Sequence, residues 1–162
     1  MQILKWLVFG TAALAVVVLL AAQLGAFSSH MPGHMGVRDG RLRAPSKTPN
    51  SVSSQADLWV RHPMQDYARI APLALKGGGP ATMAQIKRIV AALPGAKVVE
   101  SRDDYLYVQF STRWMKFVDD AEFWFDPQHN VVQVRSASRL GRKDFGVNRA
   151  RIEAIRQALS AG

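Results

Sequence analysis

Residues 131–156 read VVQVRSASRLGRKDFGVNRARIEAIR, and this stretch decides how the C-terminal part of the chain folds. It opens with strict alternation, since Val132 and Val134 would share one face while Gln133 and Arg135 share the other. A period of two predicts a half-buried strand. A polar loop and a helical pattern follow, so the stretch joins two elements of different type.

The end of the stretch has the period of an amphipathic helix. Ile152, Ile155 and Leu159 recur at spacings of three and four, which predicts one apolar face. Asn148 is a favourable N-cap residue, so we expect the helix to run from Asn148 to Ser160.

More strands are predicted upstream of the stretch. Alternation of apolar and polar residues continues over two segments, residues 105–111 and 118–126, and residues 97–101 are predicted as a further strand that meets the first of them across a short turn. The turn sequence Pro127–Asn130 joins the strand at 118–126 to the strand at 131–137. Alternation of this kind is typical of antiparallel strands with one face on a core.

A second helix precedes these strands. The sequence Thr82–Gln85 has the form of a capping box, and Pro94 ends the apolar pattern that follows it. We therefore expect an α+β fold in residues 81–160, with two amphipathic helices on one face of a small antiparallel β-meander.

The N-terminal block predicts a transmembrane helix. Residues 6–27 carry no charge, and a helix of this length spans about 33 Å, enough to cross a bilayer core. A cleaved signal peptide is the alternative, but cleavage after Ala26 would place Leu24 at the −3 site, which fits poorly. We favour an uncleaved anchor, with a tail at 1–5 and a linker at 28–36.

The remaining residues, 37–162, suffice for one domain. Six of the eight prolines lie before residue 81, so we expect residues 37–80 to be extended segments lying on the core. The formal net charge of +9 favours anionic partners, although a solvated basic surface is the simpler explanation. No helix carries a basic stripe, which argues against nucleic-acid binding.

Candidate functional residues concentrate around the loop after residue 137 and the preceding hairpin. They are polar groups suited either to ligand binding or to a structural hydrogen-bond network: Thr112, Arg113, Asp119, Asp120, Glu122, Arg135, Ser136, Ser138, Arg139, Asp144, Asn148 and Arg149. The adjacent carboxylates could act as acid and base, but we expect them to pair with Arg113, Arg135 or Arg139. No cofactor motif occurs, and the chain has no Cys. His30 and His34 have the spacing of two metal ligands on a helix, but Pro32 and Gly33 between them argue against that helix, so no metal site is predicted.

The polar face of the predicted sheet has three interpretations. Tyr107, Gln109, Glu122, Trp124 and Arg135 would lie on it. The Pro-rich segment could cover this face, it could be solvated with cross-strand charge pairs, or it could bind a ligand. The first interpretation is favoured.

Several ordered motifs resemble one known family. They are PNSVSSQ at 49–55, STR at 111–113, FVDDAEF at 117–123, VRSASR at 134–139 and DFGVNR at 144–149. In this order they are similar to the domain of unknown function family number 1499, over residues 36–158. The family pattern often has Cys around the Pro-Asn pair, whereas this chain has Ser51 and Ala44, so any thiol mechanism would be absent here.

The resemblance implies a membrane-attached or exported envelope protein and no particular activity. It favours an inner-membrane protein whose C-terminal domain lies on the outer, periplasmic side. We expect a binding or structural module for an anionic envelope component or an envelope protein. The alternative is an envelope enzyme that uses a cluster of five residues: Arg113, Asp119, Asp120, Arg135 and Arg139.

Overall fold

The structure is a computed structural model that describes all residues from 1 to 162. Its helices and strands occur in the following order: α1 (Gln2–Gln23), β1 (Ser51–Ser53), the 3-10 helix η1 (Ala56–Leu58), α2 (Gln65–Ala68), β2 (Leu73–Ala74), α3 (Gly79–Ala91), β3 (Ala96–Ser101), β4 (Tyr105–Ser111), β5 (Val118–Asp126), β6 (Val131–Ser138) and α4 (Val147–Ala161). The α+β prediction is confirmed.

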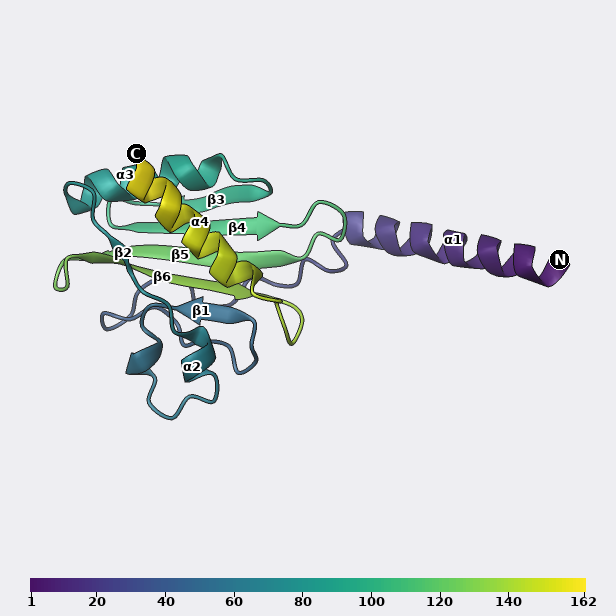
Figure 1. Ribbon diagram of the computed structural model, residues 1–162, viewed down its shortest axis with the longest axis horizontal. Coiled ribbons are helices and arrows are strands. Elements are labelled where there is room, and N and C mark those ends of the chain that lie inside the picture. The colour runs from purple at the N-terminus through teal and green to yellow at the C-terminus, as the bar shows by residue number, and fades with distance from the viewer.

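The antiparallel sheet has the order β1-β6-β5-β4-β3, and β2 pairs with another part of β6 (Figure 1). The four longer strands form the predicted meander, while β1 and β2 come from the Pro-rich part of the chain. Each longer strand alternates in side-chain direction, so one set of residues points to α3 and α4 and the other set points to the opposite face.

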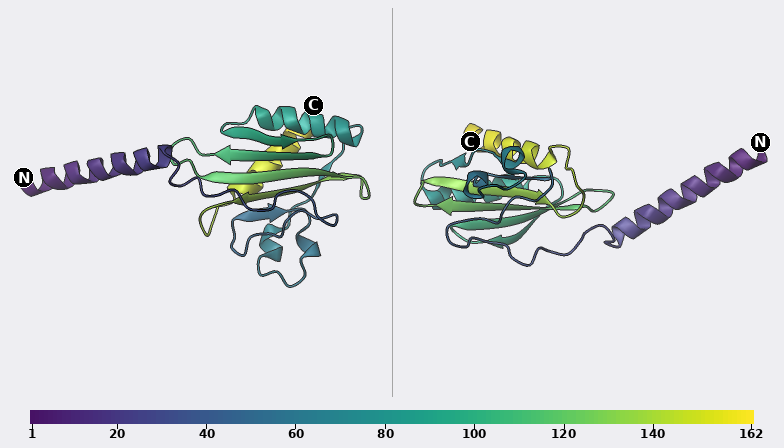
Figure 2. Two further views of the ribbon diagram at one scale, coloured as in Figure 1. Left: turned by 180° about the vertical axis from the view of Figure 1, so that it is seen from behind. Right: turned by 90° about the horizontal axis from the view of Figure 1, so that it is seen from below.

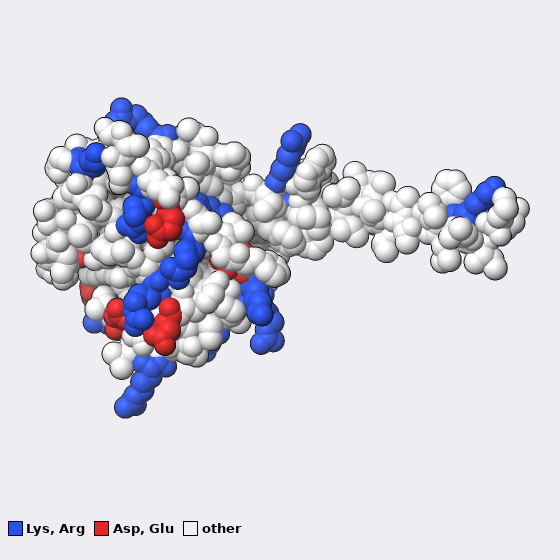
Figure 3. All heavy atoms as spheres, in the orientation of Figure 1, with Lys and Arg blue, Asp and Glu red and all other residues white.

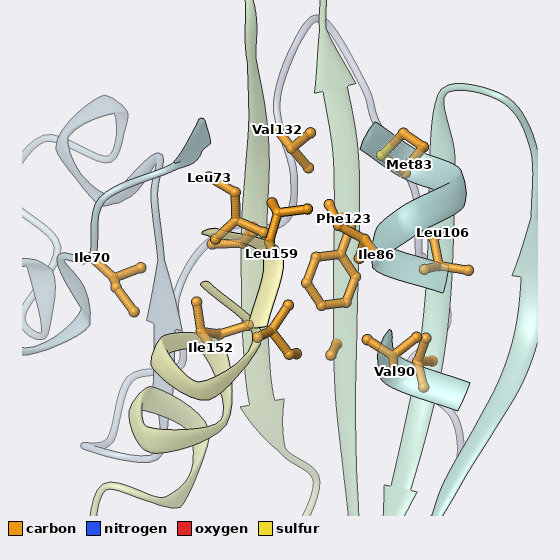
Figure 4. Packing of buried hydrophobic residues seen from close by; sticks show 14 of the residues in the cluster. Ile70, Leu73, Met83, Ile86, Val90, Leu106, Phe123, Val132, Ile152 and Leu159 are labelled. Atoms are coloured by element: carbon orange, nitrogen blue, oxygen red, sulfur yellow. The ribbon is translucent and has the colours of Figure 1, made fainter. Parts of the chain in front are cut away.

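The main core lies between the sheet and the two helices. Phe123 and Val132 from the sheet meet Ile86 of α3 and Ile152 of α4, and all four are fully buried (Figure 4). Each such side chain stabilises the fold by about 1.5–3 kcal/mol relative to an exposed position. The packed core fixes the positions of the strands that carry the candidate polar residues.

Helix α3 begins three residues before the predicted capping box. Pro80 occupies its first turn and Gly79 its first residue, where a Cβ atom would clash with the Phe125 ring. The Thr82 hydroxyl donates to the Gly78 carbonyl at 3.0 Å and accepts from the Lys76 amide at 2.9 Å. The capping-box prediction is therefore wrong, because Pro80 and the small glycine allow an earlier start close to the sheet.

Helix α4 begins at Val147, and Asn148 is not its N-cap. Gly146 precedes the helix in the left-handed conformation, with φ of 81°. The Asp144 carboxylate accepts hydrogen bonds from the amides of Gly146 at 3.0 Å and Asn148 at 3.2 Å. Asp144 thus takes over the capping role, and the Asn148 side chain is left to bind the sheet.

The second sheet face is covered by residues 28–50, which we call the cover segment. Seen from behind, it runs across the strands on the side opposite α4 (Figure 2). Leu42 is buried against Tyr105 and Tyr107, and Trp124 packs beside them. The favoured interpretation, a cover formed by the Pro-rich segment 41–75, is confirmed only in part. Leu42 and Ala44 of that segment lie on this face, but so does the stretch 35–37 upstream of it, and β1 and β2 extend the sheet instead of covering it.

Helix α1 projects away from the domain (Figure 1). It is one helix of 22 residues, long and apolar enough to cross a membrane. It ends at Gln23, before the predicted limit of 27, because the chain turns at Gly25, whose φ is 89°. Almost all of its side chains are exposed, as expected of a segment that has no partner within the domain.

Candidate functional site

Strand alternation divides the candidate residues between the two faces of the sheet. The cover-face cluster lies under the cover segment and contains Tyr105, Tyr107, Asp120, Glu122, Arg135 and Arg139. The helix-face cluster lies between the sheet and the start of α4 and contains Asp119, Ser136, Ser138, Asp144, Asn148 and Arg151. Neighbours in sequence such as Asp119 and Asp120 therefore belong to different clusters.

Asp120 and Arg139 form a closed pair in the cover-face cluster. Arg139 donates from Nε to Oδ2 of Asp120 at 2.9 Å and from Nη2 to Oδ1 at 2.8 Å. The Tyr107 hydroxyl donates to the same carboxylate at 2.5 Å. Burial, followed by this hydrogen bond, raises the pKa of Tyr107 to about 12. The predicted pairing of Asp120 with Arg139 is confirmed, and its geometry is bidentate.

Glu122 and Arg135 form the second pair and are almost entirely buried. Oε1 of Glu122 accepts from Tyr105 Oη and from the Gly36 amide, each at 2.8 Å. Its Oε2 has no hydrogen-bond partner and lies 3.8 Å from Nη1 of Arg135. Burial raises the pKa of Glu122 and lowers the pKa of Arg135. The attraction between the two charges therefore only partly offsets their loss of hydration.

Asn148 is the centre of the helix-face cluster. It accepts from the Ser136 hydroxyl at 2.5 Å and donates to Ser138 Oγ at 3.0 Å and Asp144 Oδ2 at 2.9 Å. Burial raises the pKa of Asp144, but the bonds from Asn148 and the Gly146 amide outweigh it, so the pKa falls below its usual value. This network ties β6 to the first turn of α4.

Asp119 pairs with an arginine that the sequence did not single out. Arg151 of α4 donates from Nη2 to Asp119 Oδ2 at 2.7 Å and from Nη1 to Ser136 Oγ at 3.2 Å. Its guanidinium also lies 4.4 Å from the centre of the Phe110 ring. The sequence signal that could have identified Arg151 was its spacing of three from Asn148, which places the two residues on the same face of the helix.

Three predicted site residues lie outside both clusters. Thr112 caps the β4–β5 loop by accepting from the Phe117 amide at 3.0 Å, and Arg113 of that loop stacks over Trp114 at 5.1 Å. Arg149 donates to the carbonyls of Tyr67 and Arg69 at 2.6 and 2.9 Å.

The five residues of the proposed enzyme cluster do not converge. Asp119 faces α4, whereas Asp120, Arg135 and Arg139 face the cover segment, and Arg113 lies in an exposed loop. Both acidic members are held in ion pairs, Asp120 with Arg139 and Asp119 with Arg151.

A cavity of about 520 Å³ is lined mainly by residues of the cover segment. No motif in the sequence predicted it. Three arginines line it together with His34, Trp59, Asp39 and backbone or apolar groups. Arg38 Nη2 donates to His34 Nδ1 at 3.0 Å, which leaves Nε2 of that ring as a donor when the imidazole is neutral. The available signal was the basic run at residues 38–43, RDGRLR.

The comparison with family models matches residues 41–159, most of the chain, to the family described as Protein of unknown function (DUF1499). The chain belongs to this family. No curated protein and no solved structure matches it significantly.

Three of the DUF1499 motifs of this chain, at 49–55, 134–139 and 144–149, meet at the junction of β1, β6 and α4, whereas the motif at 111–113 lies at the β4–β5 loop. Asn50 donates through Nδ2 to the Gly141 carbonyl at 2.7 Å. Gln55 accepts from the Leu42 amide at 2.8 Å and donates to the Gly40 carbonyl at 2.9 Å, which holds the cover segment in place. The motifs found by sequence thus account for the internal polar network rather than for one open site.

Proposed function

We propose that this DUF1499 protein is a membrane-anchored binding module of the cell envelope whose ligand is an anionic envelope component. The observation that carries the proposal is the arginine-lined cavity on the cover segment. We refer to it as the arginine pocket. Its volume lies within the range of small-molecule sites, and its basic lining selects for negative charge.

The geometry of the arginine pocket supports an anionic occupant. Arg38 and Arg41 are directly opposite each other in a two-residue hairpin, with backbone hydrogen bonds of 2.9 and 3.0 Å. The turn between them has positive φ at Asp39 and Gly40. Opposed residues project to the same face, where two like charges repel. An anion between them would relieve this repulsion and accept hydrogen bonds from both guanidinium groups.

Binding can be tested with the full-length chain in a neutral detergent and inorganic tripolyphosphate as a soluble anionic probe. In the Arg38→Ala/Arg41→Ala variant we expect the dissociation constant to rise by about tenfold or more at low salt, since charge-assisted hydrogen bonds to both arginines are lost. Isothermal titration calorimetry gives the constant directly.

The matched control is Lys87→Ala/Lys97→Ala, which removes the same charge from exposed positions on α3 and β3. Its affinity should stay close to that of the wild type. Equal loss in both variants would indicate a general charge effect, and no loss in either would refute the arginine pocket as the binding site.

We place the domain on the periplasmic side of the inner membrane. The length and apolar character of α1 support an anchor. The outer side is proposed because the sequence motifs resemble those of envelope proteins. Alkaline phosphatase fused after Gly162 should therefore be active, and green fluorescent protein at the same position should be dark when exported through the general secretory route. A fluorescent fusion with inactive phosphatase would place the domain in the cytoplasm.

A further inference from the structure

We propose that the junction of α1 and the β4–β5 loop binds one anionic phospholipid of the membrane that α1 spans. The headgroup would lie in a basic cavity beside the loop, and an acyl chain would lie along α1. This inference rests on the proposed membrane anchoring, and it concerns a place distinct from the arginine pocket.

The headgroup cavity has a volume of about 700 Å³ and contains three basic side chains and no acidic one. Arg113 and Lys116 come from the β4–β5 loop, and Arg151 comes from α4. Arg151 pairs with Asp119, whereas Arg113 and Lys116 form no ion pair. Two unpaired cations next to a hydroxyl, that of Thr112, are the groups that a phosphate diester binds.

A second cavity of about 440 Å³ continues from the first along α1. Val16, Leu19 and Leu20 form its apolar wall, and Trp114 lies across from them. The same two loop residues, Arg113 and Lys116, line both cavities, so a charged group and an apolar chain of one molecule would be held together.

The depth of these groups matches the layers of a bilayer. Gln23, the last residue of α1, donates to the Trp114 carbonyl at 2.8 Å, so the loop is attached where the span reaches the headgroups. From Gln23 to Val16 the groove extends about 10 Å toward the hydrocarbon, at about 1.5 Å per residue. Trp is favoured at this interface, and Lys and Arg keep their charges at headgroup level.

A contact between aromatic rings and the distribution of charge also support a lipid site beside α1. Phe27 and Phe117 pack with ring centres 5.5 Å apart. A basic side chain stands out beside the domain end of α1, while most of the helix surface carries no charge (Figure 3). A bilayer with anionic headgroups complements this combination of an apolar helix and a basic rim.

The test measures the phospholipid that stays bound to the full-length chain. The protein is extracted from vesicles of phosphatidylglycerol and phosphatidylcholine in a mild detergent and purified, and its lipid is quantified by mass spectrometry. We expect the ratio of phosphatidylglycerol to phosphatidylcholine in the bound lipid to exceed that ratio in the vesicles about tenfold. The Arg113→Gln/Lys116→Gln variant should lose this enrichment. The control Lys87→Gln/Arg88→Gln, with the same charge change on α3, should keep it.

Each other outcome overturns the proposal. Equal enrichment in both variants would show that Arg113 and Lys116 bind no headgroup. A change in oligomeric state together with lost enrichment would assign the groove to a second copy of α1. Membrane fractionation distinguishes failure of the lipid site from failure of the membrane anchoring. An anchored chain without enriched lipid refutes the lipid site alone, whereas a shortened soluble chain refutes the anchoring as well.

Discussion

The Arg139→Ala variant should be less stable than the wild type by about 3–5 kcal/mol in free energy of unfolding. Its partner Asp120 is 2% exposed, and it would lose both bonds of the bidentate pair. The Tyr107 hydroxyl alone would then face the carboxylate charge. A buried charge without its counter-ion costs far more than the pair itself contributes, which makes this one of the two largest effects expected here.

Arg139 also joins the sheet to the start of the domain. Its Nη1 donates to the carbonyls of Ser29 at 3.2 Å and Ser28 at 3.5 Å, just after α1. The hydrogen bond to the Asp120 carboxylate, helped by its charge and by the Tyr107 hydroxyl oxygen, raises the pKa of Arg139 against the opposing effect of burial. The variant should therefore loosen the cover segment in addition to lowering stability.

Urea denaturation of the micelle-held chain, followed by Trp fluorescence, measures the loss. Arg142→Ala is the matched control, because Arg142 is exposed on the same loop and makes no side-chain hydrogen bond, so its effect should stay within about 0.5 kcal/mol. The double variant Arg139→Ala/Asp120→Asn should recover part of the stability. A loss below about 1 kcal/mol in Arg139→Ala would contradict the description of the pair as buried and essential.

The meander and both packed helices could be predicted because their signal is local. Val132 and Val134 repeat with the period of a strand, and Ile152 and Ile155 with that of a helix, and both patterns are confirmed. The helix starts were missed because a small residue against Phe125 and the capping carboxylate of Asp144 outweighed the expected caps. The contact of Gly79 with Phe125 is tertiary and lies outside any short window of sequence. The Asp144 bonds are local, but Asn148 is unavailable as a cap because its side chain bonds to Ser136 and Ser138 of the sheet, which is again a tertiary contact.

The candidate site was predicted in composition but not in arrangement. Seven of the twelve predicted polar residues are buried, but Thr112 and Arg113 are exposed, and closeness in sequence was taken for closeness in space at Asp119 and Asp120. Period-two alternation sends these two carboxylates to opposite faces, and that consequence was available from the sequence. The position of the cover segment could not be predicted from the sequence, because Leu42 and Gly36 reach the sheet through an irregular path without periodicity.

The Arg135→Met variant should show a loss of stability that depends on pH. Near pH 8 we expect it to be less stable than the wild type by about 3–5 kcal/mol, because Glu122 would stay buried and charged without its counter-ion. Near pH 4 the loss should be much smaller. The reason is the direction in which burial moves the pKa of Glu122.

Burial raises the folded-state pKa of Glu122 above its unfolded value, and Arg135 partly opposes this rise. The folded state therefore binds the proton more tightly, so this contribution to stability is full below the unfolded pKa and is lost as pH rises through the folded pKa. Removing Arg135 removes the opposing attraction and raises the folded pKa further. The window of lost stability consequently opens just above the unfolded pKa and widens toward neutral pH.

Urea titrations of wild type and Arg135→Met at a series of pH values measure this difference. The double variant Glu122→Gln/Arg135→Met is the control, since it has no titrating group at position 122, so its own stability should lack the fall between pH 5 and pH 8 that Glu122 gives the single variant. If Arg135→Met instead lost the same free energy at every pH, Glu122 would have to be neutral in the folded protein throughout. In that case Tyr105 and the Gly36 amide, rather than an ion pair, would be what holds the Glu122 side chain under the cover segment.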